Sequence, residues 1–443
     1  MEKLIIGMIT TYSGRWPKEL PSNRNTEYGD WLTKQFPNAQ IVLLDMPVTS
    51  SEDLQNAVNI MHAKKVNLLV QLIGAFTGDN IAAHMAEELN VPIILWAPHE
   101  PPFDGGRLMS NALVSATMNA AALSRLEKPY HFIYGGKGDN RAVNELVRLV
   151  RVYGAIKKLK NTFLGLLGYR PTAFYSSTFD ETLIRRLFGI KIEESDLKPL
   201  FDKMEKVPQS LVDKDMATLT MPKNLPDGYA ENHSRLYIAM KQLVSEFGFN
   251  ALAIKCWPEM GNLKATPCAV LSRFADEGYI IGCESDIDAT ITMLIQNYLT
   301  NDFVFMSDLI NIDEEENTVT LWHCGQAACK LKAPEAPISM NNHPLAGQGT
   351  AFYTTLKSGS VTIARMSKIG DTYKLFLTTG KAVPTVANTT GVMVNVKLNA
   401  PVREVIYKIA EEGIPHHYSI VWQDVADDMK KLCEILNIEV IEV

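Results

Sequence analysis

The chain has 443 residues, of which 46% are hydrophobic and 21% charged, a composition typical of a globular protein of two or three domains. Its formal net charge of -7 argues against nucleic-acid binding, which usually requires a basic face. No apolar run reaches the ~18 residues of a membrane span, and no signal-peptide cleavage site follows the short apolar start. Six scattered cysteines without CxxC pairs are expected to be reduced core thiols. We therefore expect a cytoplasmic protein that binds neither nucleic acid nor membrane.

Residues 1–158 alternate short apolar runs with stretches of helical periodicity. Strands that are apolar throughout and separated by helices are typical of a parallel sheet covered on both faces. Ser50 or Ser51, and Asp79, are placed to cap the helices that follow them. This pattern predicts an N-terminal α/β domain with strands at 4–9, 41–44, 67–73, 92–96 and 130–134.

A second α/β domain is predicted for residues 159–300. Its expected strands cover 162–167, 250–255 and 279–282, and its expected helices cover 180–187, 196–207, 234–247 and 268–277. The segment 208–232 is polar and contains Pro222, Pro226 and Gly228, so we expect a long surface excursion there.

From residue 301 to 443 the period changes to an alternation of apolar and polar residues with glycine-containing turns, which predicts an antiparallel sheet or barrel. The expected strands cover 318–322, 350–356, 360–367 and 371–378, and the acidic run 313–316 is expected at a hairpin tip. The chain closes with a predicted helix over 424–436 and a strand over 438–443. The predicted fold is therefore α/β, with two Rossmann-like doubly wound parallel-sheet domains followed by an antiparallel, barrel-like β domain.

Three acidic residues follow predicted strands of the central domain. Glu259 comes after the strand that ends near Cys256, and Glu284 and Asp286 come after the strand that ends at Gly282. In an open parallel sheet, ligands bind beyond the carboxyl ends of the strands. Each residue also has a structural interpretation: Asp286 can cap the helix over 287–298, Glu284 can be hydrogen-bonded at the strand end, and Glu259 can simply occupy a tight turn.

A pair of histidines, His416 and His417, lies on a predicted turn before the final helix. Neutral imidazole is a common ligand for divalent metals. Combined with the upstream carboxylates it forms a hard donor set that suits Mn²⁺ or Mg²⁺ better than structural zinc, which prefers thiolates. The alternative is a solvated pair of loop histidines.

Two further histidines lie near predicted strand ends. Zinc binding through His323, Cys324 and Cys329 is conceivable, but their spacing matches no common zinc pattern, and a packed strand end is the alternative. His343 belongs to a polar turn over 341–347, where it is expected to line the same cleft as the acidic residues.

Two N-terminal residues follow predicted strands and are candidates for substrate contacts. Arg15 is placed to reach a ligand oxygen, or else to form a surface ion pair. Trp96 can stack on the apolar face of a sugar if it is exposed, or belong to the core if it is buried.

At these residues the chain resembles the L-fucose isomerase and L-arabinose isomerase superfamily. Cys283-Glu284-Ser285-Asp286, followed by a helix of small and apolar residues, is similar to the fucose-type segment with a metal-binding aspartate. His416-His417 before a helix and a closing strand is similar to both branches. The resemblance, which covers most of the chain, implies Glu259, Asp286 and His417 as metal ligands. The two carboxylates would also act as catalytic acid and base.

Two segments of the chain resemble the arabinose branch. Phe305-Met306-Ser307-Asp308 resembles its Phe-Met-Glu-Asp segment, and 342–347 resembles its His-x-Leu-Gly segment. Ser307 stands where that branch has a ligand glutamate, so the fucose-type triad is favoured.

The resemblance implies a Mn²⁺-dependent aldose–ketose isomerase, with Mg²⁺ or Co²⁺ as alternative metals, that acts on a free or modified sugar through an ene-diol. Deoxy, acidic and sulfonated sugars all stay open. It also implies a homo-oligomer, a trimer or hexamer, in which Arg15 serves the site of a neighbouring subunit. Expected substrate contacts are Arg15, Trp96, His343 and His416. The alternatives are an intracellular sugar-binding or regulatory protein on the same fold, and a sugar epimerase or lyase.

Overall fold

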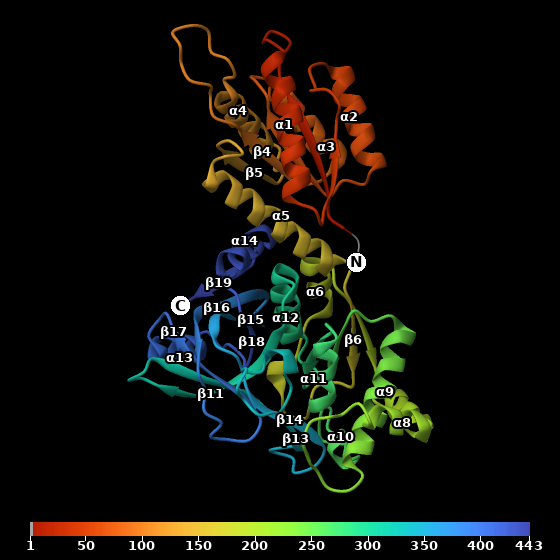
Figure 1. Cartoon of the computed structure of the whole chain (residues 1–443). Helices are drawn as coiled ribbons and strands as arrows, with labels where there is room; N and C mark the ends of the chain where they lie inside the picture. Colours follow the sequence, from red (N-terminus) through yellow and green to blue (C-terminus); the bar gives the residue numbers. More distant parts are fainter. Residues whose placement is uncertain (1–2) are drawn as a thin grey trace. The chain divides into compact units, whose positions relative to one another are not determined.

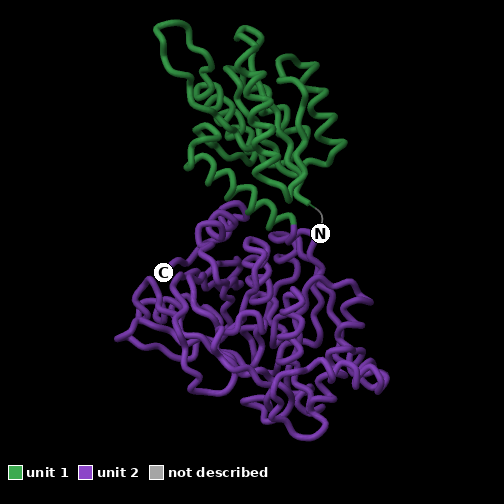
Figure 2. Tube along the Cα trace, in the orientation of Figure 1, with its two compact units in different colours: residues 1–157 green, residues 158–443 purple. Residues whose placement is uncertain are grey.

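The computed structural model describes residues 3–443, which form two compact units (Figure 2). Unit 1 ends at Lys157 and unit 2 comprises Lys158–Val443, so the chain passes from one to the other within helix α5 (Asn140–Lys160). No helix in the described part of the chain is both long and apolar enough to cross a membrane.

Unit 1 is a five-stranded parallel sheet with the strand order β2-β1-β3-β4-β5 (Figure 1). Every residue of β3 is buried, because this strand lies between β1 and β4 and helices cover both faces of the sheet. Ser50, one of the two serines predicted as the cap, caps helix α2 in a reciprocal capping box with Asp53. The elements are β1 (Ile5–Thr11), α1 (Glu19–Gln35), β2 (Gln40–Leu43), α2 (Ser51–Ala63), β3 (Leu68–Ile73), α3 (Asn80–Leu89), β4 (Ile93–Ala97), α4 (Ala112–Arg125) and β5 (Tyr130–Tyr134).

Trp96, at the end of β4, lies in the core of unit 1 and not at its surface. Its side chain is 0% exposed, and its Nε1 donates a hydrogen bond of 2.8 Å to the carbonyl oxygen of Gly135. Tyr28 and Trp31 of α1 pack against the ring edge to face. The expectation of an exposed ring that stacks on a sugar is therefore corrected: the helix that covers this face of the sheet leaves the indole no free face.

Unit 2 begins with a four-stranded parallel sheet in the order β10-β9-β6-β7. The segment over 208–232 is mostly exposed, as predicted, and it contains α8 and the short strand β8, which pairs with β13. The elements are β6 (Phe163–Leu167), α6 (Glu181–Phe188), β7 (Lys191–Ser195), α7 (Lys198–Lys206), α8 (Gln209–Met216), β8 (Lys223–Asn224), α9 (Tyr229–Phe247), β9 (Ala251–Ile254), α10 (Glu259–Asn262), α11 (Cys268–Asp276), β10 (Ile280–Cys283) and α12 (Ile287–Thr300).

The rest of unit 2 is a mainly antiparallel sheet whose central strands form a closed ring. The order β16-β15-β18-β11-β12-β17 is closed by a pairing of β16 with β17, and apolar side chains such as Phe305, Leu321, Val394 and Ile420 fill its core. The strands are β11 (Val304–Asp313), β12 (Thr318–His323), β13 (Ser339–Asn342), β14 (Thr350–Thr355), β15 (Gly359–Ile369), β16 (Thr372–Val383), β17 (Val392–Leu398), β18 (His417–Val421) and β19 (Glu439–Glu442), with helices α13 (Val402–Glu411) and α14 (Ala426–Leu436). The predicted α/β fold, with two parallel sheets and a barrel-like C-terminal sheet, is confirmed.

His233 of α9 links three elements of unit 2 as a buried, neutral histidine. Its Nδ1 lies 3.1 Å from Oγ1 of Thr350, and its Nε2 accepts from Nη1 of Arg273 at 3.2 Å. Burial, together with the positive charge of Arg273, lowers the pKa of His233 to about 3.

This lowered pKa predicts acid sensitivity of the fold. The unfolded chain, with a histidine pKa of 6.5, binds a proton that the folded chain excludes. The part of the folding free energy that depends on neutral His233 is therefore fully present above pH 6.5. It is lost as the pH falls below that value. We expect the melting temperature of the wild type to drop more between pH 7 and pH 5 than that of His233→Gln, measured by thermal unfolding. Equal drops in the two proteins would show that other groups cause the acid sensitivity.

Candidate active site

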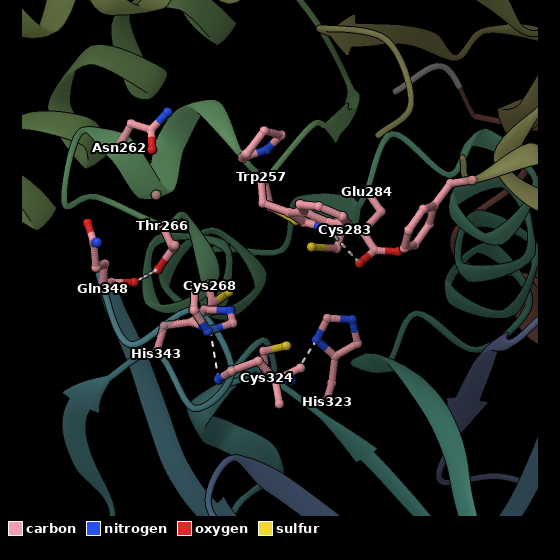
Figure 3. A pocket seen from close by; sticks show the side chains of 16 residues that line it. Trp257, Asn262, Thr266, Cys268, Cys283, Glu284, His323, Cys324, His343 and Gln348 are labelled. Carbon is pink, nitrogen blue, oxygen red and sulfur yellow. Dashed lines mark hydrogen bonds between the residues drawn. The ribbon is translucent and has the colours of Figure 1, made fainter. Parts of the chain in front are cut away.

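A cavity of about 460 Å³ opens in unit 2 at the carboxyl ends of β9 and β10 (Figure 3). Its walls come from the residues that follow these two strands, from Phe174 after β6, from the end of β12, and from the loop between β13 and β14. Glu284 is the one carboxylate among the described residues that line it. The volume lies in the ~300–1,000 Å³ range of small-ligand sites.

Glu284 owes its position to an unusual backbone. Glu284 and Ser285 both have positive φ angles, 55° and 54°, which residues other than glycine adopt only where the surroundings impose it. The hydroxyl of Ser285 holds the turn by donating to the carbonyl oxygen of Gly168 at 2.9 Å. This turn directs the carboxylate of Glu284 into the cavity, where its Oε1 accepts from Nε1 of Trp257 at 3.3 Å.

His417 is the first residue of β18, a buried strand, and not part of a turn as predicted. Its side chain is 1% exposed, and its Nδ1 lies 2.9 Å from Oδ2 of Asp286. Its Nε2 lies 3.6 Å from Oε2 of Glu284 and 3.8 Å from Oδ1 of Asp308. Because a carboxylate only accepts hydrogen bonds, Nδ1 carries a proton. The other nitrogen, Nε2, is the one that faces Glu284 and Asp308.

Asp286 serves the structure around His417. Its Oδ1 accepts from the backbone N–H of Ala289 and so caps α12, as the structural interpretation of the sequence predicts. Its Oδ2 forms an ion pair of 2.7 Å with Nη1 of the fully buried Arg365. Burial opposes ionisation of Asp286, but the guanidinium of Arg365 and the bond to His417 outweigh it and hold the pKa of this carboxyl well below its usual range.

Glu259 is separate from this centre. Its Oε1 pairs with Nζ of Lys255 at 2.6 Å, its Oε2 has no hydrogen-bond partner, and its side chain is 41% exposed. Pro258 and Gly261 line the cavity on either side of it, whereas Glu259 does not. The structure therefore brings Asp286 to His417 but does not bring Glu259 to either of them.

Among the described residues, Glu284, His416 and His417 have donor atoms close enough together to hold one metal ion. These atoms lie within 4.8 Å of one another. Burial disfavours a charge on Glu284, but a hydrogen bond from His416 and the nearby His417 lower its pKa. Burial also disfavours a charge on His417, yet Asp286, Asp308 and Glu284 together raise its pKa. The surroundings of Nε2 therefore favour a bound cation, and this set of nitrogen and oxygen donors fits a divalent metal ion.

Asp308 and Arg365 are two residues of this centre that the sequence did not single out. Asp308 lies opposite His417 in the pairing of β11 with β18, and its Oδ1 is buried without a hydrogen-bond partner. Ser307, its neighbour, faces the other side of the strand, as the two-residue period requires. The one sequence feature that could have indicated a role for Asp308 was its place at the end of the segment 305–308.

His323 and His343 differ from His417 in the direction of their hydrogen bonds. Nδ1 of His323 accepts from the backbone N–H of Cys324 at 2.9 Å, and Nδ1 of His343 accepts from the N–H groups of Leu345 and Ala346 at 3.2 and 3.0 Å. Burial lowers the pKa of each to about 4. Both imidazoles are therefore neutral with the proton on Nε2, so in this tautomer that nitrogen can donate a hydrogen bond but cannot bind a metal.

The two remaining predicted residues occupy different settings. His416 is half-buried beside Glu284, with 3.4 Å between Nε2 and Oε2, and its ring contacts that of Phe174, which lines the cavity. Arg15 is exposed in unit 1, where its backbone carbonyl accepts from Arg107. Its role as a substrate contact stays a prediction.

No family model matches this chain. Among curated proteins, the chain is similar to the sulfoquinovose isomerases of Priestia megaterium and of Alkalicoccus urumqiensis. The identity is 29% in both cases, over 90% and 89% of this chain and 90% of each relative. The sulfoquinovose isomerase of a Clostridium strain is 28% identical over 84% of this chain and 85% of its own. Among solved structures, a periplasmic solute-binding protein from Actinobacillus succinogenes with bound D-allose is 12% identical and covers 68% of this chain and 92% of its own. Its TM-score of 0.19 is too low for a structural argument.

Proposed function

We propose that this protein is an aldose–ketose isomerase that converts sulfoquinovose, a hexose with a sulfonate at C6, into the corresponding 2-ketose. One combined observation supports the proposal. The chain is similar over about nine tenths of its length to proteins named sulfoquinovose isomerase, and its cavity has a carboxylate, Glu284, beside the histidine pair. These relatives support the broader assignment to sugar isomerases as well.

The reaction moves one proton between neighbouring carbons. Glu284 takes the proton from C2 of the open-chain aldose, the electrons of the C2–H bond form the C1–C2 double bond, and O1 gains a proton. In the second half, C1 receives a proton from Glu284 and O2 loses one, which leaves the carbonyl at C2. The Nε2–H of His323 is placed to donate to an oxygen on which negative charge develops.

A divalent metal, Mn²⁺ or a similar ion, is part of the proposal. Glu284, His416 and His417 would hold it, with Asp308 beside His417. When bound, such an ion would polarise the sugar carbonyl and stabilise the developing oxyanion. Asp286 fixes the Nδ1–H tautomer of His417 and so leaves Nε2 as the nitrogen that would bind the ion.

The proposal predicts that purified protein supplied with Mn²⁺ produces the 2-ketose from sulfoquinovose. The products are followed by NMR in deuterated water, where an isomerase incorporates deuterium at C1 of the ketose. Removal of metal with a chelator is expected to abolish turnover, and Mn²⁺ is expected to restore it and to raise the melting temperature. Formation of a C2-epimeric aldose alone would identify an epimerase, and binding of sulfoquinovose without any turnover would identify a binding protein.

A further inference from the structure

The cavity has two chemically different ends. Figure 3 shows Glu284 on one side and Asn262, Thr266, His343 and Gln348 on the other. The first end carries the negative charge of Glu284. Nε2 of the nearby His417 faces that carboxylate. The second end has only neutral side chains among the described lining residues, and Asn262, His343 and Gln348 have N–H groups that can donate to a ligand.

His343 is held as a permanent donor by its own loop. Because the N–H groups of Leu345 and Ala346 both point at Nδ1, the proton is confined to Nε2. The loop closes on itself through bonds from Gly347 N–H to the carbonyl oxygen of His343 and from the Asn342 amide to the carbonyl oxygen of Gly347. The ring orientation is thus fixed before a ligand arrives.

The same loop is fastened to the segment before α11, which forms the adjoining wall at this end of the cavity. The hydroxyl of Thr266 donates to the carbonyl oxygen of Gln348 at 3.4 Å. Gly349 has a φ of 93°, and a Cβ at this position would lie 2.0 Å from Oγ1 of Thr266, so the close approach of loop and wall requires glycine. The side chain of Gln348 is exposed at the rim of the cavity, next to His343.

We propose that this end of the cavity, with His343 as its central donor and Gln348 beside it, binds the sulfonate group of the substrate. The inference rests on the proposed function. A sulfonate is a permanent anion with three acceptor oxygens and no donor, so it requires N–H and O–H groups and the absence of carboxylates. With C1 and C2 at Glu284, the C6 end of a hexose points toward this donor end.

The test compares sulfoquinovose with glucose, which has a hydroxyl at C6. His343→Leu is expected to raise KM for sulfoquinovose roughly ten- to hundredfold, with kcat little changed, because one hydrogen bond to a charged acceptor is lost. The value of kcat/KM for glucose should stay the same. His343→Gln should recover part of the loss, since its amide N–H can replace Nε2–H, and His62→Gln in unit 1 is the matched control on an exposed histidine.

Gln348→Leu provides a second variant, because the side chain of Gln348 is exposed and only its backbone holds the loop. It should raise KM for sulfoquinovose in the same selective way. Equal losses on both sugars, or no change on either, would overturn the inference.

Calorimetry with methanesulfonate separates this inference from the proposed function, because it needs no turnover. Binding to the wild type that is lost in His343→Leu supports the sulfonate site even if the protein does not isomerise sulfoquinovose. Turnover of sulfoquinovose together with methanesulfonate binding that is equal in both proteins would refute the site and leave the proposed function standing.

Discussion

Glu284→Gln is expected to lower kcat about 10²- to 10⁴-fold, the range for a residue that transfers a proton in the rate-limiting step. The glutamine keeps the shape of the side chain and can still contact Trp257 and His416, so the fold should be unchanged. It cannot accept the C2 proton, and it weakens the donor set for a divalent ion. Steady-state kinetics with sulfoquinovose, together with calorimetric titration of Mn²⁺, measure the two losses separately.

Glu259→Gln is the matched comparison for this experiment. Both glutamates follow strands of the same parallel sheet, and they differ in that Glu259 pairs with Lys255 and does not line the cavity. We expect Glu259→Gln to retain near wild-type turnover and Mn²⁺ affinity. If instead Glu259→Gln is inactive and Glu284→Gln is active, the roles inferred from the geometry are reversed, and the assignment suggested by the resemblance holds.

Arg365→Met is expected to lower the free energy of unfolding by about 3–5 kcal/mol, because it leaves the charge of Asp286 buried without its partner. Neither side chain is exposed, so water cannot replace the guanidinium. The loss is measured by urea denaturation at neutral pH. Lys198→Met, which removes a solvated ion pair with Asp202, is the control and should change the stability far less.

A double variant distinguishes the charge from the packing. Arg365→Met combined with Asp286→Asn removes the buried charge while the amide oxygen can still cap α12, so it should be more stable than Arg365→Met alone. If the double variant is the less stable of the two, lost packing and not the isolated charge accounts for the destabilisation.

Local patterns were sufficient to predict the fold and one part of the site. Continuous apolar runs gave the parallel strands except β7, whose residues are mostly polar and mostly exposed. Alternation gave β12, β14, β15 and β16 of the C-terminal sheet, but not β11, β17 or β18. The same reasoning placed Glu284 and Asp286 at a strand end and His343 in the cavity. These inferences depend only on neighbours within a few residues.

The division of roles between the acidic residues could not be predicted in this way. Asp286 is neutralised by Arg365, which is 79 residues away in the sequence, and Asp308 meets His417 through the register of two strands. Trp96 is buried because the side chains of α1 cover it, a fact of helix packing that its own strand does not reveal. Long-range pairing decides which carboxylate is structural and which faces the cavity.

The position of His417 in a closed ring of strands bears on how enzymes of this architecture can diverge. Strand β18 is paired on both sides, with β11 and with β15, so a shift by one residue would disrupt both pairings and exchange His417 for His416 or Tyr418. The register of β18, and with it the place of His417, is therefore difficult to alter by gradual change. The loop over 343–348 lies outside the ring, between β13 and β14, so an exposed side chain such as that of Gln348 can change without disturbing the pairing of β18. Under the proposed function, we expect a change of preferred sugar to begin in that loop, with Glu284 and His417 unchanged.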